Sequence, residues 1–192
     1  MGNREDLLAG AKRCLYEKGY ARTTARDIAA ASGVVSLAAI GYHYGSKEAL
    51  LNAALQQAME EWGDDLGRIL ASEGDPGATP DERFEATWAA VIGSFATHRA
   101  LWAIQFELIA NIQKMPDMRG NLADTSRQAR LALVELFGRL GSAENEEQAE
   151  KVGALYQVLL IGMAAQWLVD PETAPSGGDL IAALRAVAGT PE

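Results

Sequence analysis

Apolar residues recur at helical spacing over almost the whole of this 192-residue chain. No segment of any length alternates apolar and polar residues in the way that a half-buried strand does. The clearest break in the helical pattern is the stretch 73–80, in which two glycines and two prolines fall within eight residues. The sequence therefore predicts an all-α fold of about nine helices.

The first fifty residues predict three short helices and the start of a fourth. Gly19 and Gly33 are the expected stops of the first two helices, because glycine adopts the left-handed conformation that ends a helix. The third helix is expected to end near Tyr44-Gly45, and the fourth to run from 47 to about 70. Residues with a hydroxyl or amide side chain precede each start. The expected N-caps are Asn3, Thr24, Ser36 and Ser46.

The second and third predicted helices are joined by the Gly33 turn, and the third ends in polar aromatic residues. Leu37 and Ile40 are predicted to pack inward. The outward face of the third helix carries small residues, so its backbone can come close to the wall of a groove. Tyr42 and His43 then offer a hydroxyl and an imidazole to phosphates or base edges. This is the layout of a helix-turn-helix, whose second helix enters the major groove of DNA.

The starts of the second and fourth helices are predicted phosphate sites. Lys47 brings an ammonium group to a helix start, where free backbone N–H groups also favour an anion. Thr24 offers its hydroxyl at the start of the second helix. Arg26 is either a solvated charge or a further phosphate contact, and Tyr44 is expected to pack in the core.

The charge distribution is compatible with a DNA-binding head. The net charge is −9, but residues 1–50 hold seven Lys or Arg and five Asp or Glu, a balance of +2. Phosphate attraction depends on the local field of the contacting head, because salt screens charges beyond roughly 8–10 Å. An acidic body behind a mildly basic head does not exclude DNA binding.

Other classes of protein find little support in the sequence. The two histidines, His43 and His98, have no partners at metal-ligand spacing, and neither a phosphate-binding glycine loop nor a nucleophile elbow occurs. Neither enzyme activity nor a metal or cofactor is expected. Cys14 is expected to be buried. The chain opens without an apolar signal segment, and the apolar run 153–169 is too short and too polar to predict a membrane span. A cytoplasmic protein is expected.

The head resembles the tetracycline-repressor-like (TetR) family of bacterial transcriptional regulators. The resemblance rests on Thr24-x-x-x-Ile28-Ala29, on Gly33-Val34, and on the run Tyr42-His43-Tyr44-Gly45-Ser46-Lys47-Glu48-x-Leu50. It is close in the head and extends to the rest of the chain only in length and helical layout. By position, the residues that match the family's usual DNA contacts are Thr24, Ser36, Ala39, Tyr42, His43 and Lys47.

Two positions depart from the family's pattern. Val34 and Val35 stand between the turn glycine and Ser36, where the family usually has one residue. Gly41 stands where a tyrosine is common, so any contact made by that side chain is absent. Both departures bear on how the third helix approaches the groove.

The resemblance implies a homodimer that binds a palindromic operator, with a DNA-binding domain at 1–50 and an effector-binding and dimerisation domain at 51–192. Its implied pocket lies among helices at roughly 81–113, 121–140 and 144–169. The aromatic and apolar residues of these helices are either core or pocket wall, and aromatic-lined helices with a few polar groups are typical of an apolar ligand site. The candidates for the wall are Trp88, Ile92, Phe95, Trp102, Phe106 and Tyr156.

Polar candidates in the same helices are Gln105, Glu107, Asn111 and Gln166, of which Glu107 is expected to be a surface or paired charge. The helix 152–167 is apolar on more than one side, so it needs a second neighbour. We expect this helix and the last helix of the chain to form half of a four-helix dimer interface. The candidates for this interface are Leu159, Met163, Trp167, Leu180 and Leu184.

These observations together predict a ligand-responsive transcriptional regulator, a repressor that binds double-stranded operator DNA and is released by a small lipophilic effector. The alternative is a helical protein-interaction module that uses the head as a scaffold without sequence-specific DNA binding.

Overall fold

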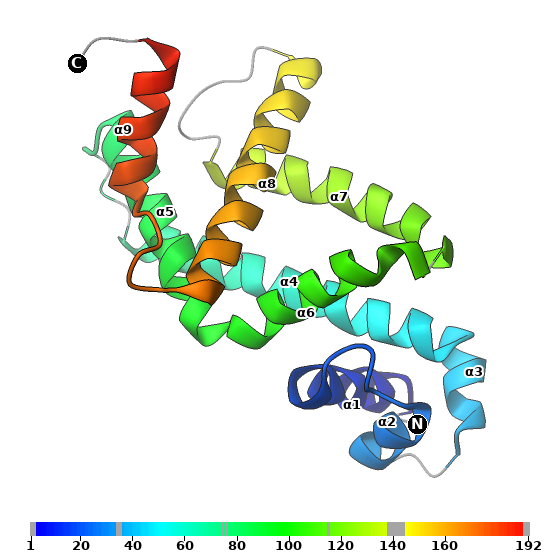
Figure 1. Cartoon of the computed structure of the whole chain (residues 1–192). Coiled ribbons are helices and arrows are strands. Elements are labelled where there is room, and N and C mark those ends of the chain that lie inside the picture. The colour runs from blue at the N-terminus through cyan, green and yellow to red at the C-terminus, as the bar shows by residue number, and fades with distance from the viewer. Residues whose placement is uncertain are drawn as a thin grey trace. The chain divides into compact units, whose positions relative to one another are not determined.

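A computed structural model describes residues 3–33, 36–73, 75, 77–114, 116–137 and 145–189. These residues form nine α-helices and one short 3₁₀ helix, η1, with no strand among them, which confirms the predicted all-α fold (Figure 1). The helices are α1 (Asn3–Lys18), α2 (Ala25–Ser32), α3 (Ala38–Tyr44), α4 (Lys47–Glu73), α5 (Pro80–Thr97), α6 (Arg99–Asn111), η1 (Ile112–Lys114), α7 (Pro116–Phe137), α8 (Glu146–Val169) and α9 (Gly177–Ala188).

Local capping explains several of these boundaries. Thr24 is the N-cap of α2, as predicted, because its hydroxyl accepts a hydrogen bond from the Asp27 backbone N–H and the Asp27 carboxylate accepts one from the Thr24 backbone N–H. Gly33 ends α2 at φ +70°, a conformation that favours glycine. Thr79 with Glu82 and Ser176 with Asp179 form the same reciprocal pair at the starts of α5 and α9.

The predicted Ser36 cap is wrong. The helix α3 begins one residue later, with Leu37 at the N-cap position in a helical conformation and with no side-chain hydrogen bond. The backbone itself closes this turn, because the Ala39 N–H donates to the Ser36 carbonyl at 3.1 Å. The prediction that Leu37 packs inward is also wrong, since that side chain is 46% exposed while Ile40 is buried.

Boundaries elsewhere follow the prediction within a few residues. The helix α7 starts at Pro116 rather than near 121, and proline is tolerated in a first helical turn. The helix α9 starts at Gly177, because Ser176 caps a glycine pair that the sequence alone suggests is a turn. The predicted start at Glu144, the helix end at 138–140 and the Val34-Val35 insertion lie outside the described residues.

The chain divides into two compact units. Unit 1 comprises residues 1–64 and 100–111, and unit 2 comprises 65–99 and 112–192. The helix α4 therefore belongs to both units, and α6 belongs to the same unit as α1, α2 and α3, although residues 19–98 lie between α1 and α6 in the sequence.

The core of unit 1 is built from one face of each of its helices. α1 packs along α2 and touches α3. Cys14 is buried in this core, as predicted, together with Ile28. Trp62 of α4 and Trp102 of α6 meet edge to face, with ring centroids 5.2 Å apart. These aromatic rings tie α6 to the first part of α4 within unit 1.

Unit 2 is built around the packing of α7 on α8 and of α5 on both α8 and α9. Glycines permit the closest approaches: a Cβ on Gly153 would lie 2.5 Å from the Arg130 carbonyl oxygen of α7, and one on Gly177 would lie 2.8 Å from the Glu85 carbonyl oxygen of α5. By length and composition alone, α8 is apolar enough to cross a membrane. One such helix is weak evidence for a membrane span; α8 packs on α5 and α7 in unit 2, and 22% of its apolar window is buried within the chain.

Candidate functional site

The end of α3 presents the most exposed aromatic side chain of unit 1. Tyr42 is 87% exposed and its ring meets that of His43 edge to face, with centroids 4.9 Å apart. Ile40, on the opposite face of α3, is buried and anchors the helix. The structure thus gives α3 an inner face that fixes it and an outer end carrying a hydroxyl and an imidazole, as a DNA-reading helix requires.

Three other residues predicted to contact DNA either have small side chains or have a side chain that forms no ion pair within the described residues. Ala39 is half-buried and Ser36 is exposed, so both leave the backbone of α3 accessible. Arg26 is exposed on α2, and within the described residues its guanidinium makes no ion pair. It remains available to a phosphate, whereas two lysines of α1 are already engaged. Lys12 pairs with Glu61, and Lys18 pairs with Asp27 at 2.5 Å.

Thr24 is committed to its own helix. Its hydroxyl donates to Asp27 Oδ2 at 2.6 Å, so the hydroxyl proton is not free for a phosphate oxygen. The hydrogen bond from Lys18, followed by those from Thr24, holds the pKa of the Asp27 carboxyl well below its ordinary value. What α2 offers to DNA at this end is therefore chiefly the exposed start of its backbone.

Lys47 has a double attachment inside the head. Its Nζ donates to the Thr23 carbonyl oxygen at 3.1 Å and lies 3.3 Å from Glu48 Oε1. An ammonium group has three N–H donors, so one remains for a phosphate. The contact to Thr23 fixes Lys47 relative to the loop that precedes α2.

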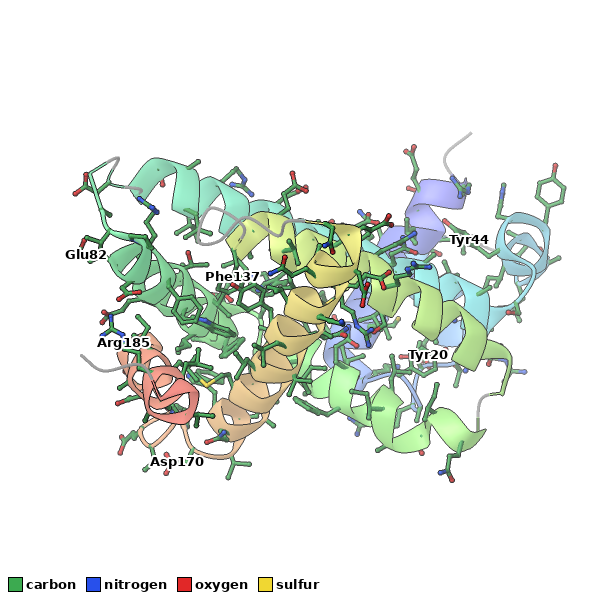
Figure 2. The ribbon with its side chains drawn as sticks, turned by 90° about the horizontal axis from the view of Figure 1, so that it is seen from above. Tyr20, Tyr44, Glu82, Phe137, Asp170 and Arg185 are labelled. Atoms are coloured by element: carbon green, nitrogen blue, oxygen red, sulfur yellow. The ribbon has the colours of Figure 1, made fainter. Side chains whose placement is uncertain are left out.

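Tyr44, labelled in Figure 2, connects α3 to the beginning of α1. Its hydroxyl donates to the Arg4 carbonyl oxygen at 2.8 Å, and the Arg4 guanidinium lies 5.4 Å from the centre of its ring. Burial raises the pKa of this phenol. Tyr44 is half-buried rather than packed in the core as predicted, and it holds α3 against α1.

The turn between α1 and α2 is held by a residue of α6. Glu107 accepts hydrogen bonds from the backbone N–H groups of Tyr20 and Ala21, at 3.0 and 2.9 Å. The sequence predicts a surface or paired charge, whereas Glu107 is half-buried and these partners are backbone amides of the head rather than a basic side chain. The sequence does not predict this connection. Glu107 lies 87 positions after Tyr20 and 86 after Ala21, and no local pattern relates residues so far apart.

An aromatic cluster occupies the middle of unit 2. Phe137 of α7 lies at its centre, stacked on Tyr156 of α8 with centroids 4.6 Å apart and 5.0 Å from the ring of Trp88 of α5 (Figure 2). Phe84 contacts both Phe137 and Trp88. The cluster thus brings together two predicted pocket residues, Trp88 and Tyr156, and adds Phe137 and Phe84. The i, i+4 spacing of Leu133 and Phe137, which places both on one face of α7, is a sequence signal that could have identified Phe137.

Trp88 is fully buried, and its indole N–H has no hydrogen-bond partner in the described structure. Such a donor costs about 1–3 kcal/mol when it is left unsatisfied, so a buried indole of this kind favours a partner brought by a ligand or a water molecule. Burial also raises the pKa of the Tyr156 phenol, which is half-buried beside Phe137.

The remaining pocket candidates divide between the units. Phe95, buried in unit 2, contacts Trp167 with centroids 5.9 Å apart, and Ile92 is half-buried on the same helix. Trp102 and Phe106 belong to α6 and thus to unit 1. A polar contact absent from the candidates lies in unit 2: Gln157 Oε1 accepts from Arg130 Nε at 2.8 Å, and its amide group bonds to Ser126.

The candidate interface residues have different exposures. Met163 is buried within the chain itself, Leu159, Trp167 and Leu180 are half-buried, and Leu184 is exposed. The most exposed of the large apolar side chains of α8 and α9 lie at other positions on the same helices. They are Val158, Val169 and Val187, which are 68%, 87% and 89% exposed.

Two family models match the chain. Residues 7–54 match the model described as bacterial regulatory proteins of the tetR family, and residues 79–190 match the tetracyclin repressor-like C-terminal domain. The first match contains α2, the turn and α3, and the second contains most of unit 2 together with α6. Both halves of the chain therefore match one kind of protein.

Relatives of the chain are helix-turn-helix regulators. The HTH-type transcriptional regulator TtgR of Pseudomonas putida is 27% identical over 182 residues, which are 92% of this chain and 85% of that protein. The HTH-type transcriptional repressor KstR2 of Rhodococcus jostii is 32% identical over 113 residues, or 57% of this chain; the match spans about half of that repressor's length, at 53%.

Solved structures give the same result for the fold. The multidrug binding protein EbrR, in complex with imidazole, is 26% identical with a TM-score of 0.61, over 90% of this chain and 82% of that one. A TetR transcription regulator from Haloarcula marismortui has a TM-score of 0.62 at 19% identity, over 97% and 95% of the two chains. With a head and a C-terminal domain that both match its models, the chain belongs to the TetR family of helix-turn-helix transcriptional regulators.

Proposed function

We propose that the protein is a cytoplasmic repressor that binds a palindromic operator as a homodimer and releases it when a small lipophilic effector enters unit 2. The observation that carries the DNA-binding part is α3, anchored by buried Ile40 and ending in the exposed Tyr42 beside His43. Tyr42, His43, Ala39, Ser36 and Arg26 are the proposed groove and phosphate contacts. Thr24 and Lys47 contribute mainly through the helix starts at which they lie.

The homodimer is proposed from the apolar surface of α8 and α9. Val158, Val169 and Val187 are each more than two-thirds exposed, and Leu184 adds to this surface. Exposed valines on two neighbouring helices in sequence favour a partner that covers them. A second copy presents the same helices, which gives the self-complementary contact of a twofold dimer. Leu159, Trp167 and Leu180 keep enough exposed surface to take part, whereas Met163 supports the interface from within the chain.

A lipophilic effector is proposed from the aromatic cluster of unit 2. Phe137, Tyr156 and Trp88 offer flat apolar surfaces, and the unpartnered Trp88 indole offers a hydrogen-bond donor. This mixture of large apolar area and a few polar groups is what small-molecule sites contain. A relative described as a multidrug binding protein supports the same class of ligand.

Release is proposed to follow a shift in the population of two conformations. The helix α4 passes without interruption from unit 1 to unit 2, so a rearrangement of unit 2 has a covalent route to the head. In the DNA-bound dimer the two heads would be spaced by about 34–36 Å to reach successive major grooves. A coupling of about 1–3 kcal/mol changes operator affinity about 5- to 150-fold.

Operator binding is tested with a palindromic duplex from beside the protein's own gene, at several salt concentrations. The expected result is sequence-specific binding whose affinity falls linearly with salt on a logarithmic scale. Tyr42→Ala should weaken the sequence-specific component at least tenfold while leaving the folded state intact. Binding that is absent at low salt, or equal for a scrambled duplex, would favour the alternative of a helical protein-interaction module.

The dimer and the effector are tested separately. Sedimentation should give about twice the 20.5 kDa mass of one chain. Effector candidates are lipophilic aromatic compounds screened by quenching of tryptophan fluorescence in wild type and in Trp88→Phe. A compound that binds without changing operator affinity at fixed salt would contradict the release mechanism.

A further inference from the structure

The turn between α1 and α2 is held from a distant part of the sequence. Residues Tyr20 and Ala21 follow the end of α1 and present two neighbouring backbone N–H groups. Both oxygens of the Glu107 carboxylate are used, Oε2 by Tyr20 and Oε1 by Ala21. An ionised acceptor that receives two N–H donors makes bonds about twice as strong as neutral ones.

Gly19 makes room for this carboxylate. It has φ +80°, and a Cβ at this position would lie 2.9 Å from Glu107 Oε2. The backbone conformation at this position therefore favours glycine, and the absent side chain also leaves room for the end of the Glu107 side chain. No Lys or Arg within the described residues pairs with Glu107, so the backbone amides are its principal partners.

The same turn is attached to the DNA-facing parts of the head. Tyr20 is buried and its hydroxyl donates to Asn52 Oδ1 of α4 at 3.0 Å. Thr23 is also buried, with its hydroxyl donating to the Gly19 carbonyl oxygen at 2.7 Å, and its own carbonyl oxygen accepts from Lys47 Nζ. The next residue, Thr24, caps α2. The turn thus fixes both Lys47 and the start of α2.

We propose that Glu107 is a positioning residue for operator binding: its carboxylate holds the α1–α2 turn and thereby sets the orientation of α2 and the place of Lys47. The inference rests on the DNA-binding function of the head. Glu107 itself need not touch DNA, and all the groups in this chain of contacts belong to unit 1.

Replacing Glu107 by a neutral residue distinguishes the effect of the turn geometry on operator affinity from the effect of net charge. Glu107→Gln keeps the size of the side chain and one oxygen acceptor, but it places an NH₂ group against one of the two backbone donors. Removal of a negative charge by itself should strengthen attraction to the DNA polyanion. A weakening of operator binding would therefore run against the charge change and must come from the altered turn.

The experiment uses the full chain and a duplex that the wild-type protein has selected from a random-sequence pool. Glu60→Gln is the matched control, since it removes one carboxylate charge from an exposed position on α4. Gln105→Ala controls for a change on α6, because Gln105 is half-buried and its side chain makes no hydrogen bond to the residues that the structure describes. The expected dissociation constant of E107Q is about tenfold higher than that of E60Q, equivalent to about 1.4 kcal/mol.

Amide exchange reports the turn directly, without DNA. In protein labelled with ¹⁵N-tyrosine, the Tyr20 amide should exchange about tenfold faster in E107Q, because an acceptor has been lost. The Tyr156 amide, inside α8, is the internal reference and should not change. These two readings, a faster Tyr20 amide and an unchanged Tyr156 amide, would support the positioning role.

Several results would overturn the inference. One is that E107Q binds the selected duplex as tightly as E60Q. Another is that melting temperature and Tyr156 protection fall along with affinity, because Glu107 would then support the fold as a whole. If the wild type selects no duplex, the proposed operator binding fails by itself, and Tyr20 exchange that is equal in wild type and E107Q would still refute the role of Glu107.

Discussion

Gly153→Ala tests the closest helix contact in unit 2. Gly153 is buried on α8 and faces the backbone of α7. An added Cβ would lie 2.5 Å from the Arg130 carbonyl oxygen and 2.9 Å from its carbonyl carbon. An ordinary carbon–oxygen contact is about 3.3–3.6 Å, and backbone atoms within a helix cannot rotate away. The two helices must therefore separate locally by nearly 1 Å.

The expected loss of stability has three contributions. Overpacking costs about 1–3 kcal/mol, and the upper part of that range applies because the clash is with backbone. Separation of the helices also lengthens the 2.8 Å hydrogen bond from Arg130 to Gln157, which costs about 1 kcal/mol. Alanine regains about 1 kcal/mol of helix propensity over glycine. The free energy of unfolding should fall by about 2 kcal/mol.

Urea unfolding at fixed protein concentration, followed by circular dichroism, measures this change. Gly67→Ala is the matched control, because Gly67 is exposed on α4 and its added Cβ would meet nothing within 4 Å. That variant should gain up to about 1 kcal/mol. In a thermal scan G153A should melt about 4–8 °C lower than wild type. A G153A protein as stable as G67A would refute the inferred closeness of α7 and α8.

Three other predictions concern separate parts of the molecule. Tyr42→Ala should weaken specific operator binding at least tenfold with no change in melting temperature, because the side chain is 87% exposed; equal binding by gel shift would remove Tyr42 from the interface. Asp27→Asn should lower the melting temperature near neutral pH. Since the pKa of Asp27 is lowered on folding, its contribution is present above about pH 4 and disappears as the pH falls further, so the wild-type and variant melting temperatures should converge in acid. Gly162→Ala adds a Cβ with no neighbour within 4 Å in one chain, yet should raise the dimer dissociation constant about tenfold in sedimentation if α8 pairs closely with its copy; an unchanged constant would place the interface elsewhere.

Features that depend on nearby residues could be predicted from the sequence. Thr24 and Asp27 lie within one helical turn, so their reciprocal cap is visible as a pattern, and the glycine stop at Gly33 is equally local. Burial of Ile40 and exposure of Tyr42 follow from the short amphipathic pattern of α3. The head was therefore largely predictable.

Features that depend on distant residues were not predictable. The bonds of Glu107 to the turn join segments that no helical period relates. The Ser36 cap is a local feature that was also predicted wrongly, because the Ser36 backbone carbonyl accepts the hydrogen bond that its hydroxyl was expected to accept. Phe137 entered the aromatic cluster through the packing of α7 on α8 and α5, which composition alone does not determine.

The membership of α6 in unit 1 has a consequence for protein engineering. An excised fragment that stops after α4 would carry Trp62 without Trp102 and the Tyr20 amide without its acceptor. A chimera that joins the DNA-binding head to the ligand-binding domain of another protein would therefore have to include residues 100–111 along with the amino-terminal segment. The structural unit that carries the head consists of two separate segments of the sequence, and both must be transferred together.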